Sequence, residues 1–281
     1  MDRSVVICGG PDLEARMRAY VQLVGRRRVS ISSSIRRFSG AIVDIRGGLA
    51  SKRLIPAWQQ HGCAVISDAP LARTLDRSQA LLNQGDMLLT LPSLYDPRYQ
   101  LILQKSAEGA IGKLITIRLI RLLPIQSPLW DSIALTYGLD PLAALQVLGG
   151  PVTRIMAWEQ ALKRRRPDTL FATGRFEGGG IFYLELSAAY PRDYQFERIE
   201  VVGTEGVLEY DSNRNRTLRV ITAAGSTLHS AIYEPALLRM LRDYLRHVDD
   251  ASAMEKHRER ARAALELLFR AVNSAQSHET R

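Results

Sequence analysis

The first hundred residues alternate between short apolar runs and amphipathic stretches. The apolar runs predict buried strands at residues 4–8, 29–31, 41–45, 63–66 and 87–91. Apolar side chains at helical spacing predict helices between them, at residues 13–24, 49–60 and 73–83. Strands and helices that alternate at this interval are typical of parallel βαβ units.

From residue 112 onward the runs lengthen and short glycine-rich turns join them. Strands are predicted at residues 112–123, 152–158, 168–176, 180–188, 196–202, 207–210 and 217–221, and helices at 140–148, 234–247 and 253–274. Strands linked by short turns favour one open antiparallel sheet. We therefore predict an α/β protein with a shortened Rossmann-like domain over residues 1–108. An α+β domain with a large, mostly antiparallel open sheet is expected over 109–281, including the closing helix.

The net charge and the two cysteines limit the classes of protein to which this chain can belong. The chain of 281 residues has 38 Lys and Arg against 29 Asp and Glu, a net charge of +9. Its basic clusters, at residues 26–28, 36–37 and 163–166, are scattered and belong to no nucleic-acid-binding signature, so solvated faces are predicted. Cys8 and Cys63 lie in apolar strands and are interpreted as buried, unreactive thiols.

Other signals are lacking in the sequence. No apolar run approaches the roughly 20 residues that span a bilayer, and the N-terminal segment does not have the pattern of a signal peptide. A cytoplasmic location is therefore expected, without a membrane partner. The five histidines show no metal-ligand spacing, so no metal site is predicted.

Five segments of the chain resemble the Gfo/Idh/MocA family, the group of glucose–fructose oxidoreductase and inositol dehydrogenase. They are residues 108–114, 142–152, 201–208 and 263–275, together with 68–72, where the family has its "E-K-P-L-A". The resemblance implies an oxidoreductase fold, NAD(P) as cofactor and a sugar or polyol as substrate. It also implies that the outer face of the second sheet forms a homo-oligomer, or a hetero-oligomer with an active homologue.

The same resemblance places a dinucleotide along Gly9, Gly10, Arg46, Asp68 and Pro70. The phosphate loop should read G-x-G-x-x-G, because the second glycine lets the pyrophosphate approach the backbone. Counted from Gly9, the second and third glycine positions hold Pro11 and Glu14, of which Pro11 has no N–H to offer.

The second strand lacks the acid that holds a ribose 2′-hydroxyl in the family. Ser33 and Arg36 could face a 2′-phosphate instead, so NADP is preferred over NAD if a dinucleotide binds at all. Only residues 35–40 separate this strand region from the next strand. A parallel crossover needs about a dozen residues or more, so one βαβ unit of the family is predicted to be missing.

The residues that would donate or accept protons in the family's reaction are replaced in this chain. The family's lysine position holds Ala69, and the histidine and aspartate positions before "L-G-G-P-V" hold Leu139 and Leu142. The remaining candidates for a catalytic role are Asp68, Tyr137 and Asp140. Asp140 is also explained as the N-cap of a helix that begins at Pro141.

Three hypotheses follow for the function. The first is a Gfo/Idh/MocA-like protein that has lost dehydrogenase activity and serves as a partner subunit, a binder of a sugar-like ligand or a regulator. The second is an active NAD(P)-dependent oxidoreductase that acts on a sugar, polyol or related hydroxy compound with non-standard residues. The third, ranked last, is a basic nucleic-acid-binding module.

Overall fold

A computed structural model describes residues 3–10, 13–32, 40–230 and 234–279. The chain forms two compact units. One comprises residues 1–92 and 235–266, and the other comprises residues 93–234 and 267–281. The sequence led us to expect a boundary at residue 108 and to assign the whole C-terminal segment to the second domain.

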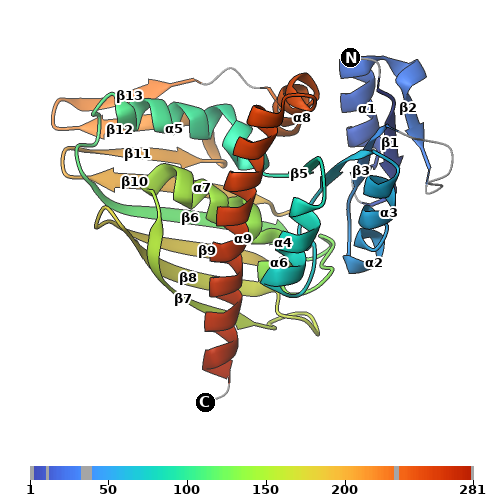
Figure 1. Cartoon of the computed structure of the whole chain (residues 1–281). Coiled ribbons are helices and arrows are strands. Elements are labelled where there is room, and N and C mark those ends of the chain that lie inside the picture. The colour runs from blue at the N-terminus through green and yellow to red at the C-terminus, as the bar shows by residue number, and fades with distance from the viewer. Residues whose placement is uncertain (1–2, 11–12, 33–39, 231–233, 280–281) are drawn as a thin grey trace. The chain divides into compact units, whose positions relative to one another are not determined.

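The first unit contains a five-stranded parallel sheet in the order β2-β1-β3-β4-β5 (Figure 1). Its strands are β1 (Val5–Cys8), β2 (Val29–Ile31), β3 (Ile42–Ile45), β4 (Ala64–Ser67) and β5 (Met87–Leu89). Strands β1, β3 and β4 are buried along their whole length, as their continuous apolar runs predict for a parallel sheet covered on both faces. The predicted parallel domain is confirmed.

The helices of this unit follow the predicted order with one break. They are α1 (Leu13–Val24), η1 (Arg26–Arg28), α2 (Leu49–Lys52), α3 (Ile55–Gln60), α4 (Leu75–Asn83), α8 (Ala236–His247) and the first part of α9 (Ala251–Glu279). A single helix over residues 49–60 was predicted, but it is interrupted after Lys52. Pro56 explains the break, because it lacks an N–H and its ring would clash with the carbonyl of Lys52 in a continuous helix.

The strand order confirms the predicted shortening of the parallel sheet. Strand β2 is the edge strand beside β1, and the next strand in sequence, β3, pairs with the other side of β1. Residues 32–41 are all that connects the two strands. No strand in the described part of the sheet covers the outer edge of β2, and Ile31 is 52% exposed there.

The second unit is built on an eight-stranded sheet in the order β13-β12-β11-β10-β6-β9-β8-β7. Its strands are β6 (Leu114–Pro124), β7 (Val152–Gln160), β8 (Thr169–Phe176), β9 (Ile181–Tyr190), β10 (Phe196–Gly203), β11 (Gly206–Asp211), β12 (Arg214–Thr222) and β13 (Gly225–His229). Only the central pair β6–β9 is parallel, so the predicted mostly antiparallel open sheet is confirmed. The polar hairpin strand β13 was not predicted.

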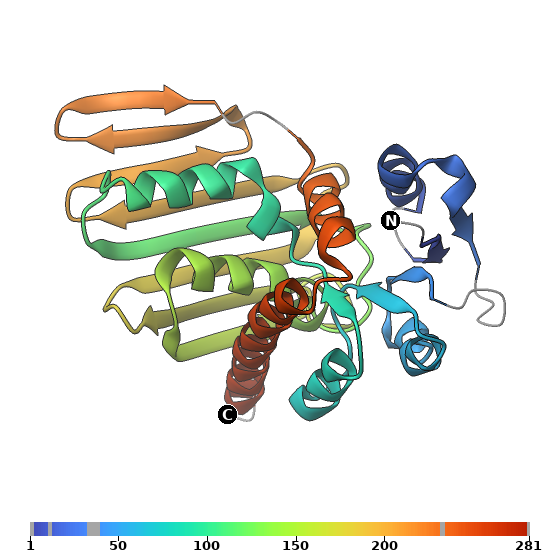
Figure 2. The ribbon, with the colours of Figure 1, turned by 45° about the horizontal axis from the view of Figure 1, so that its top comes forward.

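Helices cover one face of this sheet (Figures 1 and 2). The unit contains η3 (Pro92–Tyr95), α5 (Pro97–Ala107), α6 (Ile133–Tyr137), α7 (Leu139–Gly149) and the last part of α9. Helix α9 is fastened to β7, since Arg270 donates to the carbonyl of Val152 (2.7 Å) and Ser274 accepts from the N–H of Ala157 (3.0 Å). The opposite face of the sheet carries exposed aromatic side chains.

Candidate functional site

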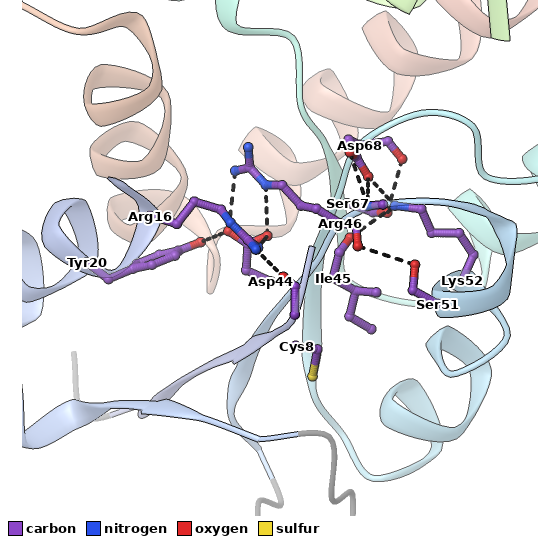
Figure 3. Close-up of polar contacts among 12 residues, drawn as sticks. Cys8, Arg16, Tyr20, Asp44, Ile45, Arg46, Ser51, Lys52, Ser67 and Asp68 are labelled. Atoms are coloured by element: carbon purple, nitrogen blue, oxygen red, sulfur yellow. Dashed lines mark hydrogen bonds and ion pairs between the residues drawn. The ribbon is translucent and has the colours of Figure 1, made fainter. Parts of the chain in front are cut away.

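The carboxyl ends of β1, β3 and β4 bring several predicted residues together (Figure 3). Gly9 and Gly10 follow β1, Arg46 follows β3, and Asp68 follows β4. Parallel strands end at a common edge, which is where open α/β sheets bind their ligands. Pro70 lies two residues beyond Asp68. The other two predicted contacts, Ser33 and Arg36, lie outside the described residues.

A buried cluster of charges occupies this edge of the sheet. Asp44, fully buried in β3, accepts hydrogen bonds from Arg16 Nη1 (3.0 Å), Tyr20 Oη (3.0 Å) and Arg46 Nε (2.9 Å). Arg16 is itself fully buried, and both Arg16 and Tyr20 point from α1 toward the sheet (Figure 3). Burial raises the pKa of Tyr20 well above its usual value, and the Asp44 carboxylate raises it further. Of these residues, only Arg46 was predicted from the sequence.

The glycine turn after β1 is held by contacts within the chain. Arg16 Nη2 donates to the carbonyl of Gly9. Gly10 has φ +86°, and a Cβ atom there would lie 2.7 Å from the carbonyl oxygen of Arg46. A side chain would collide with the backbone at that distance, so Gly10 permits a close approach between two loops of the protein.

These contacts do not fit a bound dinucleotide. A pyrophosphate needs the close approach that glycine gives and free N–H groups at the start of the following helix. The side of Gly10 that lacks a Cβ packs against the Arg46 backbone, and the guanidinium of Arg16 is committed to Gly9 and Asp44. Pro11, which stands at the second glycine position of the motif, lies outside the described residues.

A lysine that the sequence analysis missed reaches the segment beside Ala69. Lys52, buried in α2, donates from Nζ to the carbonyl of Ile45 (3.1 Å), to Ser67 Oγ (2.7 Å) and to the Asp68 carboxylate. Burial lowers the Lys52 pKa, although the Asp68 charge opposes that shift. An ammonium group has three N–H bonds, and all three are engaged here. Lys52 therefore holds β3 and β4 together at their ends.

Asp68 is a partly accessible member of the three catalytic candidates that the sequence named. Its side chain is 24% exposed. One carboxylate oxygen accepts from the backbone N–H of Gly47 (3.1 Å) as well as from Lys52. A carboxylate has about four acceptor sites, so Asp68 keeps acceptor capacity for a ligand hydroxyl beside these two donors.

Tyr137 and Asp140, the other two candidates, have structural partners in the second unit. The Tyr137 hydroxyl donates to the carbonyl of Pro128 (2.5 Å). The interpretation of Asp140 as an N-cap was wrong, because α7 begins at Leu139 and its N-cap is Gly138. The Asp140 carboxylate instead accepts from the backbone N–H of Ser93 (2.8 Å) and pairs with Arg121 (2.7 Å).

The Asp140 pair belongs to a larger buried network. Arg121 also pairs with Glu197 (3.1 Å), which accepts a hydrogen bond from the Tyr99 hydroxyl (2.6 Å). Burial favours the neutral form of Glu197, but Arg121 and Tyr99 together lower its pKa below the usual value. The charges of Arg121, Asp140 and Glu197 are paired with one another, so the network joins α5 and α7 to the sheet. Leu139, at the family's histidine position, is a buried core residue.

Both cysteines are buried, as predicted. Burial raises the pKa of the Cys8 thiol to about 11, with a further contribution from Asp44, and burial also raises that of Cys63. The thiolate is the reactive form of cysteine. Neither side chain is therefore suited to act as a nucleophile.

The basic cluster at residues 163–166 forms part of a turn. Buried Asp168 accepts from the backbone N–H groups of Lys163 (2.8 Å) and Arg164 (2.9 Å). The Arg164 side chain donates to the carbonyl of Ser127 (2.8 Å), and Arg166 donates to the carbonyl of Leu129 (3.1 Å). Two of these arginines therefore have a structural role in connecting two loops.

The chain has an α/β fold in which a parallel Rossmann-like sheet is combined with a large, mostly antiparallel sheet, and solved structures of oxidoreductases share this fold. Three solved structures with this fold resemble the chain at a TM-score of 0.78. An oxidoreductase from Agrobacterium radiobacter in complex with NAD⁺, L-tartaric acid and magnesium is 14% identical, with 98% of this chain and 97% of that chain covered. A levoglucosan dehydrogenase in complex with NADH and levoglucosan is 17% identical, with the same coverage.

The third structure is UDP-N-acetylglucosamine 3-dehydrogenase GnnA from Acidithiobacillus ferrooxidans. It is 14% identical to this chain, and the match covers 98% of each of the two chains. No protein-family model matches the sequence, and no curated protein matches it. At these identities the likeness establishes the fold, and the chemistry has to be argued from the residues. Among the described residues, no helix has the combination of length and apolar character that a membrane span requires.

Proposed function

We propose that this protein has the fold of a nicotinamide-dependent sugar oxidoreductase but does not transfer hydride, and serves as a ligand-binding or partner subunit. The observation that carries the proposal is the buried pair of Arg16 and Asp44 beneath the glycine turn. A buried guanidinium that is bonded to both the Gly9 carbonyl and Asp44 ties the turn to the protein's own charges, and this is what supports a turn that does not receive a diphosphate.

The strand-end residues support the same conclusion. Ala69 has no proton to exchange, and the nearby Lys52 has its three N–H bonds engaged. General acid–base groups contribute about 10²–10⁴-fold each to a rate, so a site without them would be slow even if a dinucleotide entered. Asp68 remains as a partly exposed acceptor for a ligand hydroxyl.

Calorimetric titration of the full chain with NAD⁺, NADH, NADP⁺ and NADPH tests the proposal. We expect no heat of binding at ligand concentrations up to about 1 mM. A known NAD-dependent dehydrogenase, titrated in parallel, shows that the cofactor solutions are active. Micromolar binding of any of the four would refute the proposal, and preferential binding of NADPH would support the earlier preference for NADP.

An active oxidoreductase with non-standard residues is the alternative, and the exposed Asp68 carboxylate is the observation that favours it. That hypothesis predicts a change in nicotinamide absorbance with a polyol or sugar, and its loss in Asp68→Ala or Tyr137→Phe. Levoglucosan and L-tartaric acid, named with the structural neighbours, are suitable first compounds for both the activity assay and a binding screen.

The outer face of the second sheet supports a partner role. Trp158 pairs with Phe171 across β7 and β8, and Met156 and Tyr183 lie on the same face, all four exposed by 44–49%. Contiguous exposed apolar side chains are typical of protein interfaces. We propose that a second copy of this chain covers this face. Sedimentation velocity should show a dimer or larger species that dissociates in Trp158→Glu.

The matched control is Leu162→Glu, which alters an exposed apolar residue in the turn after β7. It should leave the oligomeric state unchanged. A wild-type protein that sediments as a monomer at tens of micromolar would exclude self-association through this face. Mixing with an active homologue would then test the hetero-oligomer instead.

A further inference from the structure

A groove of about 600 Å³ lies on the first unit between α3 and α4. Strands β3, β4 and β5 are neighbours in the sheet in that order, so two right-handed crossovers place both helices on the same face of it (Figure 2). The volume falls within the range of about 300–1,000 Å³ that small-molecule sites occupy. None of the residues that line the groove belongs to the cluster around Asp44 or to the pair of Lys52 and Asp68.

Each of the two helices turns one side toward the groove. Helix α3 contributes Pro56, Gln59 and Gln60, at the i, i+3 and i+4 spacing of a single helical side. Helix α4 and its C-cap contribute residues at the spacing i, i+3, i+4 and i+7, which are Arg77, Ala80, Leu81 and Gln84. Gln60, Arg77 and Gln84 are exposed, so the two sides do not close on each other and the groove is open to solvent.

The amide of Gln59 has an unmet need for hydrogen bonds. Its Nε2 and Oε1 atoms are both buried, and neither has a hydrogen-bond partner among the described residues. The amide lies against Gly85, where a Cβ atom would be 3.6 Å from Nε2. A buried amide without a partner costs free energy, because it has lost water and gained nothing in its place. Rotation about the Gln59 side-chain bonds would bring the amide into the groove, where a ligand could supply the missing partners.

Arg77 gives the groove its charge. Its side chain is exposed, and it forms no hydrogen bond or ion pair with another residue in the part of the chain that the structure describes. Arg77 lies in the first turn of α4, where the helix dipole adds to its positive charge. The described lining holds this one cation and no acidic side chain, since the neighbouring Asp76 does not line the groove. The groove is therefore suited to a ligand with one negative charge.

We propose that this groove binds a small polyhydroxylated molecule with one carboxylate, of the class of sugar acids. A side-chain amide both donates and accepts hydrogen bonds, as a hydroxyl group does, and Gln59, Gln60 and Gln84 supply three amides. A guanidinium pairs with a carboxylate through two parallel N–H···O bonds and matches its single charge, whereas a phosphate carries up to two charges. Pro56 and Leu81 offer apolar surface to the carbon atoms of the ligand. The site is independent of the function proposed above, because it shares no residue with the strand-end cluster.

NMR titration of the ¹⁵N-labelled full chain with D-glucuronate tests the proposal. The side-chain amide signal of Gln59, identified by its loss in Gln59→Leu, should shift as the ligand binds. We expect a dissociation constant of about 1 mM or below, because the ligand is small and the groove is open. D-Glucose has the same ring without the carboxylate and should bind at least tenfold more weakly.

The variants separate the two kinds of contact. Arg77→Gln should weaken glucuronate binding at least fivefold and leave glucose binding unchanged, whereas Gln59→Leu should weaken both. The matched control is Arg260→Gln, which removes an exposed arginine of the same unit outside the groove and should bind as the wild type does. Circular dichroism melting checks that each variant is folded, and the exposed position of Arg77 keeps that variant usable if Gln59→Leu unfolds.

Three results would overturn the proposal. The first is equal weakening in Arg77→Gln and Arg260→Gln, which would show attraction by overall charge. The second is equal affinity of the wild type for glucuronate and glucose, or no shift of the Gln59 signal at 20 mM glucuronate. The third is binding of glucose 6-phosphate without binding of glucuronate, which would make the ligand a phosphate.

Discussion

Replacement of Asp44 by leucine should strongly destabilise the first unit. In the folded protein the Asp44 carboxylate accepts from two guanidinium groups, at 2.9 and 3.0 Å, and from the Tyr20 hydroxyl. Leucine has a similar volume but leaves the fully buried Arg16 and the partly buried Arg46 without their common acceptor. Removal of one partner from a buried ion pair costs about 3–5 kcal/mol of unfolding free energy. Because Asp44→Leu leaves two cations without their acceptor, its expected loss lies at or above the upper end of that range.

Arg16→Met removes one cation and leaves Asp44 paired with Arg46 and bonded to Tyr20. The expected loss is therefore near the lower end, about 3 kcal/mol. The exposed Arg53→Met is the control and should change the stability by about 0.5 kcal/mol or less. Urea unfolding followed by far-ultraviolet circular dichroism measures all three variants, with the slope of each transition compared.

The most discriminating result is which of the two variants, Asp44→Leu or Arg16→Met, loses more unfolding free energy. If Arg16→Met unfolds at the same urea concentration as Arg53→Met, the cluster does not hold α1 onto the sheet. The glycine turn after β1 would then not be held closed by the charges of Arg16 and Asp44. If Arg16→Met is more destabilising than Asp44→Leu, Arg16 acts mainly through its bond to the Gly9 carbonyl.

Three further predictions concern other buried groups. Burial raises the pKa of Tyr20 and Tyr99, with Asp44 and Glu197 as the second cause, so these phenols keep their protons in the folded state when the unfolded chain loses them. Below about pH 10 these tyrosines should not change the free energy of unfolding. Above about pH 10 each should lower it by about 1.4 kcal/mol per pH unit. Urea unfolding at pH 9–11 measures this slope, and Tyr20→Phe should reduce it. Cys8 and Cys63 should react with a thiol reagent at pH 8 over hours in buffer but within minutes in 6 M guanidinium, and rapid labelling in buffer would contradict their burial. Asp140→Ala should cost about 1–3 kcal/mol in urea unfolding, because Arg121 and the Ser93 N–H lose an acceptor while Arg121 keeps Glu197, and a loss below about 0.5 kcal/mol would exclude a structural role.

The sequence by itself determined the two-sheet architecture. Apolar runs at β1, β3 and β4 and the alternation in the second half reflect which faces are buried, and that pattern is written locally along the chain. The short connection between β2 and β3 was also visible as a length. The break after Lys52 was missed, although Pro56 marked it, because helical periodicity in the residues around it suggested one continuous helix.

The tertiary structure alone decided which charges meet. Asp44 within the apolar run Ile42–Ile45 was a sign of a buried ion pair, but its partners Arg16 and Tyr20 come from a helix 24–28 residues earlier in the chain. Periodicity records whether a side chain faces inward and contains no information on what it meets there. The partner of a buried charge is set by how helices pack on the sheet. For that reason the closed glycine turn appears only once the chain is folded.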